Sequence, residues 1–508
     1  MMATSRKREM VTLGSLVTGV NLPEALRRLK VGGLCIDSRQ LRPGDLFLAF
    51  PGTRVDGRDY IDAAVARGAV AVLAEGRDLV VEPRIVPVIP VRNLARRLPV
   101  IASRFYGEPA KELVVTGVTG TNGKTTCSQL LAQLLAQLTE RCGVVGTLGS
   151  RVVQSAAARQ SDSRHDDTGM TTPDPVKLQA ILADFKRQQV RHVAMEVSSH
   201  SLDQERVGAV PFQVAIFTNL TRDHLDYHGS LDNYIEAKLK LFRRPGLAWA
   251  IINADDPLAE RVRKAVEPKA QVLTYAVSAA ADIRCDNVAA SEDGIAARLV
   301  TPWGEGHIES ALIGTFNLGN LMAAIAAACV QGFELADVLA AVPALQPIPG
   351  RMEVVRPGVQ PLVVVDYAHT PDALEQVLKS LRNHCGEGGQ LWCVFGCGGD
   401  RDQGKRSLMG TAASRFADRL VLTSDNPRNE EPQAIIDAIL EGVRGTHPTV
   451  LPERAAAIAY AIANAAPADV VLVAGKGHET YQEVVGQRLP FSDLYHARMA
   501  LNERGGEA

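Results

Sequence analysis

The sequence predicts an α/β protein of three domains. Its 508 residues correspond to three domains at about 150 residues each. Short apolar runs rich in β-branched residues alternate with helical runs along most of the chain, which predicts parallel sheets covered by helices. The composition changes at Glu108-Pro109 and again in a proline-rich linker at 342–350. We therefore expect domains at 1–109, 110–342 and 343–508.

The composition excludes several classes of protein. Hydrophobic residues make up 46% and charged residues 22%, as in folded soluble proteins. The net charge of -2 argues against a nucleic-acid-binding surface, but not against a local basic pocket. No apolar run reaches the roughly 20 residues that cross a bilayer, and no apolar signal segment follows Arg6, Lys7 and Arg8. We expect a cytoplasmic monomer without membrane insertion.

The eight cysteines are scattered and form no CxxC pair. This pattern predicts small core side chains in a reducing compartment. Cys393 and Cys397 flank the end of a predicted buried strand, so a zinc or redox site is the alternative there.

The first domain is predicted to hold strands at 34–36, 46–50, 69–73 and 85–90, with a helix at 61–67 and a turn-rich loop at 52–57. In the second domain, buried strands are expected at 113–117, 143–147, 193–197, 214–219 and 248–253, with helices at 125–138 and 318–329. Residues 270–313 lose this rhythm and predict a small β-meander. The third domain is predicted to be Rossmann-like, with strands at 362–366, 391–395, 419–424 and 470–474.

The strongest motif is the loop at 117–126, between a buried strand and an amphipathic helix. Its glycines let backbone N–H groups approach phosphate oxygens, and the start of a helix favours negative charge. Lys124 is expected to reach the β- and γ-phosphates and Thr125 to bind Mg²⁺. Five residues rather than four separate Gly117 from Gly123, so a plain glycine turn opening a helix is the alternative.

The Thr-Gly-Thr-Asn-Gly-Lys-Thr sequence at 119–125 resembles that of the Mur ligase family, the ATP-dependent amino-acid ligases of peptidoglycan synthesis. Further segments resemble the same family in the same order, at 195–200, 219–229, 234–238, 314–320, 366–371 and 396–401. Short matches at 37–39 and 44–47 extend the resemblance to nearly the whole chain.

Within the family, the sequence is most similar to the ligases that add the third residue of the stem peptide, through Asp425-Asn426-Pro427-Arg428 and the segment 475–479. The resemblance implies a reaction that joins meso-2,6-diaminopimelate to the D-Glu γ-carboxylate of UDP-N-acetylmuramoyl-L-alanyl-D-glutamate. An acyl phosphate is the implied intermediate, and ATP becomes ADP and phosphate.

The resemblance also implies roles for particular residues. Lys124, Glu196, His224 and Lys238 would be catalytic, and Thr125, Glu196, His224 and Lys238 would serve magnesium. The ATP set is Gly120, Thr121, Asn122, Gly123, Lys124, Thr125, Thr126, Asn317, Asn320, Arg351, Asp366 and His369. The UDP-dipeptide set is Ile36, Ser38, Thr53, Arg54, Val55, Thr171, Thr172, Ser198, Gln204 and Arg206, and the diaminopimelate set is Arg401, Asp425, Asn426, Pro427, Arg428, Gly475 and Glu479.

Structural roles compete with several of these assignments. On sequence alone Lys238 is a helix-surface lysine, whereas the resemblance implies that CO₂ carbamylates it; Lys240 is the competing candidate. The structural alternatives for the other residues are as follows. His224 would be a packed or capping residue, Asn317 and Asn320 would be helix caps, Asp366 would be a strand-end cap, and residues 425–428 would form a turn.

Arg428 can be argued physically as a specificity residue. Meso-diaminopimelate differs from lysine by a carboxylate at its far end, and a guanidinium binds a carboxylate bidentately. A site built for that carboxylate leaves Arg428 unpaired when lysine is offered, which lowers affinity. Glu479 would hold the distal ammonium.

Other functions stay open at this point. A lysine-adding ligase, the dipeptide-adding ligase and folylpolyglutamate synthase are alternatives within the superfamily. A P-loop switch or motor ATPase is the alternative from another class. The phosphate loop and Arg428 fall in different predicted domains, so we also expect closure across the linker.

Overall fold

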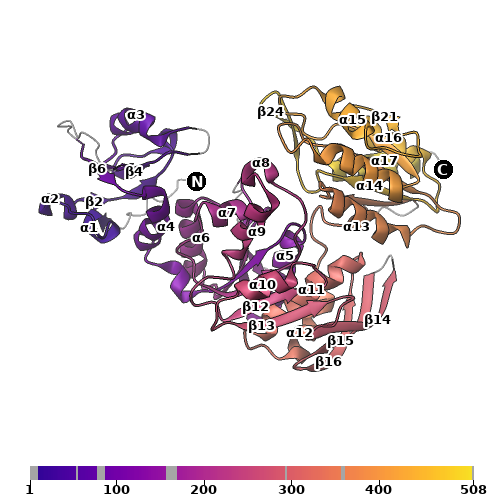
Figure 1. The fold of residues 1–508 in the computed structure, drawn as a ribbon, viewed down its shortest axis with the longest axis horizontal. Coiled ribbons are helices and arrows are strands. Elements are labelled where there is room, and N and C mark those ends of the chain that lie inside the picture. The colour runs from indigo at the N-terminus through magenta and orange to yellow at the C-terminus, as the bar shows by residue number, and fades with distance from the viewer. Residues whose placement is uncertain are drawn as a thin grey trace.

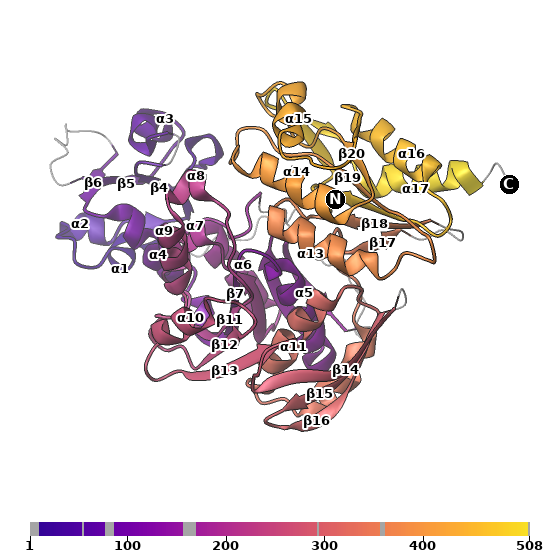
Figure 2. The same cartoon turned by 45° about the vertical axis from the view of Figure 1, so that its right-hand side comes forward.

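The computed structural model describes residues 10–52, 55–76, 86–155, 169–291, 294–355 and 361–505. Three main sheets follow one another along the chain and define an N-terminal, a central and a C-terminal unit, coloured from indigo to yellow in Figure 1. In both views of the molecule the central unit lies below the other two (Figure 2). The predicted α/β class is confirmed.

The N-terminal unit contains a parallel sheet in the order β3-β4-β5-β6. Its strands are β3 (Gly33–Cys35), β4 (Asp45–Ala49), β5 (Ala71–Glu75) and β6 (Val88–Val91). Because side chains alternate along β4, Leu46 and Leu48 pack with α4 (Leu94–Phe105), whereas Phe47 and Ala49 pack with α3 (Ile61–Ala66). The remaining elements are β1 (Val11–Thr12), α1 (Leu13–Leu16), α2 (Glu24–Arg27), β2 (Lys30–Val31), η1 (Ser38–Gln40) and η2 (Gly57–Tyr60).

The central unit is built on one sheet in the order β16-β15-β14-β13-β12-β11-β7-β10-β8-β9. Its strands are β7 (Val114–Thr119), β8 (Arg141–Gly146), β9 (Gly149–Gln154), β10 (His192–Glu196), β11 (Phe212–Phe217), β12 (Trp249–Asn253), β13 (Gln271–Ala276), β14 (Ile283–Ser291), β15 (Gly294–Thr301) and β16 (Gly304–Ser310). The pairings from β8 through β10, β7, β11, β12 and β13 to β14 are all parallel. A short η3 (Pro109–Glu112) precedes β7.

Helices cover both faces of this sheet, as a buried parallel sheet requires. One face packs against α5 (Lys124–Thr139), α11 (Thr315–Cys329) and α12 (Leu335–Ala341). The other packs against α6 (Pro175–Arg187), α7 (Ser199–Asp203), α9 (Leu231–Leu239) and α10 (Ala259–Ala265), and α8 (Leu225–His228) precedes α9. Helix α6 also contacts α4, which attaches the N-terminal unit.

The meander predicted for 270–313 is only partly correct. Strand β13 pairs in parallel with both β12 and β14, and the antiparallel pattern begins only at β14 and continues through β15 and β16. The segment extends the central sheet at its edge and does not form a separate small sheet.

The C-terminal unit contains a sheet in the order β17-β18-β22-β19-β20-β21. Its strands are β17 (Glu353–Val355), which is antiparallel, and β18 (Leu362–Asp366), β19 (Leu391–Phe395), β20 (Arg419–Leu422), β21 (Thr449–Val450) and β22 (Val470–Ala474). One face packs against α13 (Pro371–Arg382), α14 (Lys405–Phe416) and α15 (Pro432–Leu440), and the other against α16 (Arg454–Asn464) and α17 (Asp493–Gly505). A hairpin of β23 (Tyr481–Val484) and β24 (Gln487–Pro490) precedes α17.

The proline-rich linker is packed tightly against the central unit. Val342, Leu345 and Ile348 belong to the core around α5 and α11, and η5 (Val342–Ala344) opens the segment. Gln346 N donates to Gln133 Oε1 at 2.7 Å, and Gln133 Nε2 donates back to Gln346 O at 3.1 Å. The chain therefore leaves the central unit only after Ile348.

Two expectations from composition can be compared with the fold. In the part of the chain that the structure describes, no helix combines the length and apolarity that crossing a membrane requires. The eight cysteines are unpaired, and Cys393 and Cys397 are buried in the core of the C-terminal unit, as small core residues would be.

Candidate active site

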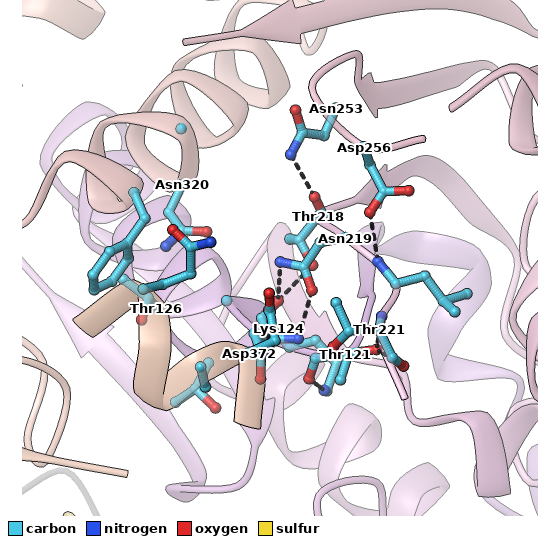
Figure 3. Close-up of a pocket in the computed structure, with 18 of the residues that line it drawn as sticks. Thr121, Lys124, Thr126, Thr218, Asn219, Thr221, Asn253, Asp256, Asn320 and Asp372 are labelled. Atoms are coloured by element: carbon cyan, nitrogen blue, oxygen red, sulfur yellow. Dashed lines mark hydrogen bonds between the residues drawn. The ribbon is translucent and has the colours of Figure 1, made fainter. Parts of the chain in front are cut away.

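A cavity of about 840 Å³ opens between the central and C-terminal units. The loop after β7, the ends of β10, β11 and β12, and the first turns of α11 contribute from the central unit. The end of β18 and the start of α13 contribute from the other. Asn253 and Asp256 lie on one side of this cavity and Asn320 and Asp372 on others, around the loop that carries Lys124 (Figure 3). Ligands bind at this edge of α/β sheets because parallel strands end there together.

The loop after β7 has the backbone of a phosphate site. Gly120 has a φ of +152°, and a Cβ there would overlap the Thr218 hydroxyl. Gly123 has a φ of +81° and caps α5, so the first N–H groups of that helix face the cavity. Lys124 Nζ donates to the carbonyls of Gly120 at 3.0 Å and Thr121 at 2.7 Å. The predicted strand, glycine loop and helix are all present.

A buried carboxylate stands beside this loop. Glu196 ends β10 and is 0% exposed. It accepts hydrogen bonds from Thr125 Oγ1 at 2.9 Å, Thr147 N at 2.8 Å and Thr147 Oγ1 at 3.0 Å. A Cβ on Gly146 would overlap Glu196 Oε1. Thr125 and Glu196 thus offer adjacent hard oxygen atoms, a donor set that fits Mg²⁺ when phosphate and water oxygens complete the shell.

Side chains alone do not enclose a metal ion here. Among the described residues, no three His, Cys, Asp or Glu side chains gather closely enough to hold one. A magnesium ion at this position would therefore need further oxygen ligands from a bound phosphate or from water, as is usual for this ion.

Lys238 is buried, so the surface position expected from sequence alone is wrong. Its side chain on α9 is 2% exposed, and Nζ donates to Gly120 O at 2.6 Å. Nζ also lies 4.6 Å from the centre of the Tyr234 ring. Burial, followed by the nearby charge of Lys124, holds the pKa of Lys238 well below its usual value. Lys240 instead pairs with Asp203 at 2.9 Å, outside this cavity.

His224 lines the same cavity as the loop that carries Lys124. It has a φ of +55° and precedes α8, so it occupies the capping position that sequence allowed, but its side chain makes no capping bond. Its Nε2 is 3.5 Å from Asp223 Oδ2, and its ring is 4.8 Å from that of His200. Burial lowers the pKa of His224, although Asp223 opposes the shift, so a ring nitrogen is free of a proton at neutral pH.

The C-terminal unit reaches the phosphate loop directly. Arg351 Nη2 donates to Thr125 Oγ1 at 3.2 Å, and its guanidinium lies 4.2 Å from the Tyr367 ring centre. Asn122 Nδ2 donates to Asp372 Oδ2 at 3.2 Å. Asp366 accepts from the backbone of Met352 and Ala368, both at 2.7 Å, so it is a strand-end cap that also lines the cavity.

The helix-capping role, the alternative considered for Asn317 and Asn320, is wrong. The cap of α11 is Gly314, and both asparagines lie within the helix. Asn317 Nδ2 donates to Ile313 O at 2.8 Å, and Asn320 Nδ2 donates to Asn317 Oδ1 at 3.1 Å. Asn320 lines the cavity, where a Cβ on Gly123 would lie 2.5 Å from its Oδ1. Asn317 thus orients Asn320 towards the loop.

The residues expected to bind the UDP-dipeptide fall into two groups. In the central unit, Arg206 Nη1 donates to Thr172 O at 3.0 Å, and Thr172 Oγ1 donates to Glu196 O at 2.9 Å. Arg206 Nε also donates to Gln204 Oε1 at 2.8 Å. Thr171, Thr172, Ser198, Gln204 and Arg206 are therefore close to the cavity, whereas Ile36, Ser38 and Val55 lie in the N-terminal unit. Thr53 and Arg54 lie outside the described residues.

The residues expected to bind the amino acid lie at the carboxyl ends of β19, β20 and β22. Asn426 Nδ2 donates to Glu479 Oε2 at 2.8 Å, which joins the loops after β20 and β22. Arg428 has a φ of +53°, which is unfavourable for a side chain of its size. Arg401 is exposed and donates to the neighbouring Asp400 carbonyl at 3.5 Å.

Arg428 is held by partners that sequence did not reveal. Its Nη1 donates to Gly399 O at 2.7 Å, and its Nε pairs with Glu483 Oε2 at 3.1 Å. The expectation that Arg428 is unpaired without the distal carboxylate of the substrate is therefore wrong, because Glu483 already supplies a carboxylate. Of the described residues that line the cavity, none belongs to the set expected to bind the amino acid. Tyr367 connects the cavity with the loop after β22. It lines the cavity, and its ring centre lies 5.3 Å from that of His478 in this loop.

Sequence reasoning missed further residues of the site. Asn253, the last residue of β12, lines the cavity together with Asp255 and Asp256, which follow the strand. Their place at the end of a predicted buried strand was an available signal. Lys476 is 0% exposed, and its Nζ donates to Asn426 Oδ1 and Glu479 Oε2, both at 2.9 Å. No local pattern distinguishes such a buried lysine from an exposed one.

Three family models match consecutive parts of the chain. They describe a "Mur ligase family, catalytic domain" at 30–106, a "Mur ligase middle domain" at 118–328 and a "Mur ligase, glutamate ligase domain" at 350–477.

Individual proteins are similar over nearly the full length. The UDP-N-acetylmuramoyl-L-alanyl-D-glutamate–2,6-diaminopimelate ligase of Pseudomonas aeruginosa is 51% identical, over 94% of this chain and 96% of its own. A solved structure of a ligase with the same name is 36% identical with a TM-score of 0.68, covering 98% of this chain and 100% of that one. The MurF ligase of Thermotoga maritima in complex with ADP shares the fold, at 20% identity and a TM-score of 0.64, over 93% and 98% of the two chains.

The first prediction concerns the pH dependence of stability at the cavity wall. Burial, then the charge of Lys405, lowers the pKa of His369 from 6.5 to about 4. Between these values the unfolded chain binds more protons than the folded one, so stability is lost as the pH falls through this window. The slope of the unfolding free energy against pH is proportional to the difference in bound protons between the unfolded and the folded chain. We expect His369→Gln to reduce this difference by up to about one proton per molecule. Denaturant unfolding of both proteins from pH 7 to pH 4 measures the slope, and equal slopes would contradict the assignment.

Proposed function

The chain belongs to the Mur ligase family, and from that premise we propose that it adds meso-2,6-diaminopimelate to UDP-N-acetylmuramoyl-L-alanyl-D-glutamate in peptidoglycan synthesis. The observation that carries the proposal is the 51% identity to the Pseudomonas aeruginosa ligase over 94% of this chain. The cavity between two units supports it, because an ATP-driven ligase must bring nucleotide and acceptor together.

The chemistry needs an activated carboxylate. An oxygen of the D-Glu γ-carboxylate attacks the γ-phosphorus of ATP, the bond to ADP breaks, and an acyl phosphate forms. The amine of diaminopimelate then attacks the acyl carbon, the phosphate leaves, and the amine loses a proton as the amide forms. Both steps gather negative charge in a small volume, so positioning and positive potential are the main demands on the protein.

The site residues fit these demands. Lys124 and the first N–H groups of α5 would bind the β- and γ-phosphates, and Arg351 would add positive charge from the C-terminal unit. Thr125 and Glu196 would hold one Mg²⁺ near the nucleotide, and His224 would serve a second Mg²⁺. Magnesium, when bound, neutralises the crowded phosphate oxygens.

Carbamylation of Lys238 is part of the proposal. Its neutral amine is favoured by the lowered pKa, and a neutral amine can attack the carbon of CO₂. The nitrogen forms a bond to that carbon and loses a proton, which converts a cation into a carboxylate. The carboxylate would place a negative charge close to Lys124, which donates to Gly120 O as Lys238 does.

We also propose that the reaction takes place in the cytoplasm and that the chain acts as a monomer. The unpaired cysteines fit a reducing compartment. The cavity is complete within one chain, since both of its walls come from the same molecule.

The deciding measurement is phosphate release from ATP with the UDP-dipeptide and candidate amines. We expect turnover only when the UDP-dipeptide and meso-diaminopimelate are both present. Equal turnover with L-lysine would refute the specificity, and hydrolysis indifferent to both substrates would indicate a switch or motor ATPase instead.

Arg428 provides a separate prediction about specificity. Because a lysine cannot pair bidentately with a carboxylate, we expect Arg428→Lys to raise the KM for meso-diaminopimelate about tenfold or more and leave that for ATP nearly unchanged. Steady-state kinetics with each substrate varied in turn measures both. A rise in the KM for ATP instead would place Arg428 at the nucleotide.

A further prediction concerns Lys238. Protein equilibrated with ¹³C-bicarbonate should show a carbamate carbon signal that Lys238→Ala lacks and Lys240→Ala retains. Lys238→Ala should lose activity, because the carboxylate that positions magnesium is gone, and short-chain carboxylates should restore part of it. A carbamate signal that persists in Lys238→Ala would refute the assignment.

A further inference from the structure

Arg454, the first residue of α16, places a guanidinium in the interior of the C-terminal unit. Arg454 is 1% exposed, and its partner Asp493, the first residue of α17, is 0% exposed. Nε donates to Asp493 Oδ1 at 2.7 Å and Nη2 to Asp493 Oδ2 at 2.8 Å. A buried ion pair contributes little net stability compared with apolar residues of the same volume. Its presence therefore calls for an explanation beyond the stability of the fold.

The same guanidinium reaches the ends of two strands. Nη1 donates to Ser424 O at 3.2 Å, and Nη2 donates to Ala474 O at 2.9 Å. Ser424 follows β20 and Ala474 ends β22. These strands do not pair with each other, because β19 lies between them in the sheet. Arg454 thus ties together two backbone segments that the sheet joins only through a third strand.

The next residue after each of these carbonyls belongs to the candidate amino-acid site. Asp425 follows Ser424, and Gly475 follows Ala474. The two loops approach so closely that a Cβ on Gly475 would lie 2.7 Å from Asp425 Oδ2. Further along, Asn426 and Glu479 are hydrogen-bonded across the same gap, and Lys476 bonds both. A small shift of either loop would break this arrangement.

We propose that Arg454 is a positioning residue for the incoming amino acid, acting through the two carbonyls that begin the Asp425 and Gly475 loops. The inference rests on the proposed function of those loops. The guanidinium does not line the cavity, and the carboxylate of Asp493 balances its charge inside the core. Its contribution is therefore the relative placement of the loops, which a planar fork of several donors defines better than a single ammonium.

The test is Arg454→Lys, which keeps the charge and loses the fork. We expect the KM for meso-diaminopimelate to rise about tenfold or more, while those for ATP and the UDP-dipeptide change by less than about twofold. A merely structural residue would lower the amount of active enzyme, and so the apparent kcat, without this selective change in KM. Equal changes for all three substrates, or no change, would overturn the proposal.

Arg504 offers a matched control on the same pair of helices. It lies on α17, and its Nη1 donates to Ile462 O at 2.5 Å and Ala465 O at 2.6 Å at the end of α16. It therefore ties α17 to α16 far from the two loops. We expect Arg504→Lys to lower the Tm without raising the KM for meso-diaminopimelate. A rise equal to that in Arg454→Lys would assign the effect to helix packing and overturn the proposal.

A second variant covers the case in which Arg454→Lys does not fold. Arg454→Met combined with Asp493→Leu removes both buried charges together, and we expect the same selective rise in KM. Failure of both variants to fold would assign the pair to stability and overturn the inference. The wild-type enzyme separates the two proposals: if its turnover does not require meso-diaminopimelate, the proposed function fails, whereas a normal wild type with an unaffected Arg454→Lys refutes only the positioning role.

Discussion

Two lysine side chains that share one hydrogen-bond acceptor constrain the whole site. Lys124 Nζ and Lys238 Nζ both donate to the carbonyl of Gly120, at 3.0 and 2.6 Å, beside the positive end of α5. Burial, followed by the nearby charge of Lys124, lowers the pKa of Lys238. The loop is therefore suited to a polyanion, and the buried carboxyl group of Glu196 stands beside it through its hydrogen bond with Thr125. A chain with a net charge of -2 can thus hold an anionic nucleotide, because its positive potential is concentrated at this loop.

The sheets determine which residues can reach that loop. Strands β7, β10, β11 and β12 run parallel, so Thr121, Glu196, Asn219 and Asn253 all emerge at one edge. Strand β18 ends facing the same gap and brings Asp366 and Tyr367. The loops proposed to bind the amino acid lie at the corresponding edge of the C-terminal sheet, after β19, β20 and β22. Two sheets that present their carboxyl ends towards one another give the protein room for reacting groups contributed by separate units.

Much of this arrangement was accessible from sequence. Buried parallel strands appear as apolar runs, so the strand before Glu196 and the strand before the phosphate loop were predicted to within a few residues. The burial of Lys238 was not, because helix α9 packs one face against the sheet and the other against the phosphate loop, and tertiary packing decides which side is covered. The alternative capping role of Asn317 and Asn320 fails because α11 begins earlier than predicted, at Thr315, so both side chains lie inside the helix. Lys476, Glu483 and Arg454 act through partners more than 25 residues away or through buried pairs, which one sequence does not disclose.

The packed linker determines the position about which the C-terminal unit could rotate. Since the chain is anchored to the central unit through Ile348, Gly350 is the natural pivot, and it presses against Gly477 and His478, where a Cβ would overlap the His478 nitrogen. Points close to an axis travel short arcs, and distant points travel long ones. Any swing of the C-terminal unit would therefore carry the hairpin of β23 and β24 far more than the Gly477 turn. Because Arg428 pairs with Glu483 of β23, such a swing would move the Arg428 end of the candidate amino-acid site together with the hairpin, whereas the Gly477 end would stay beside Gly350.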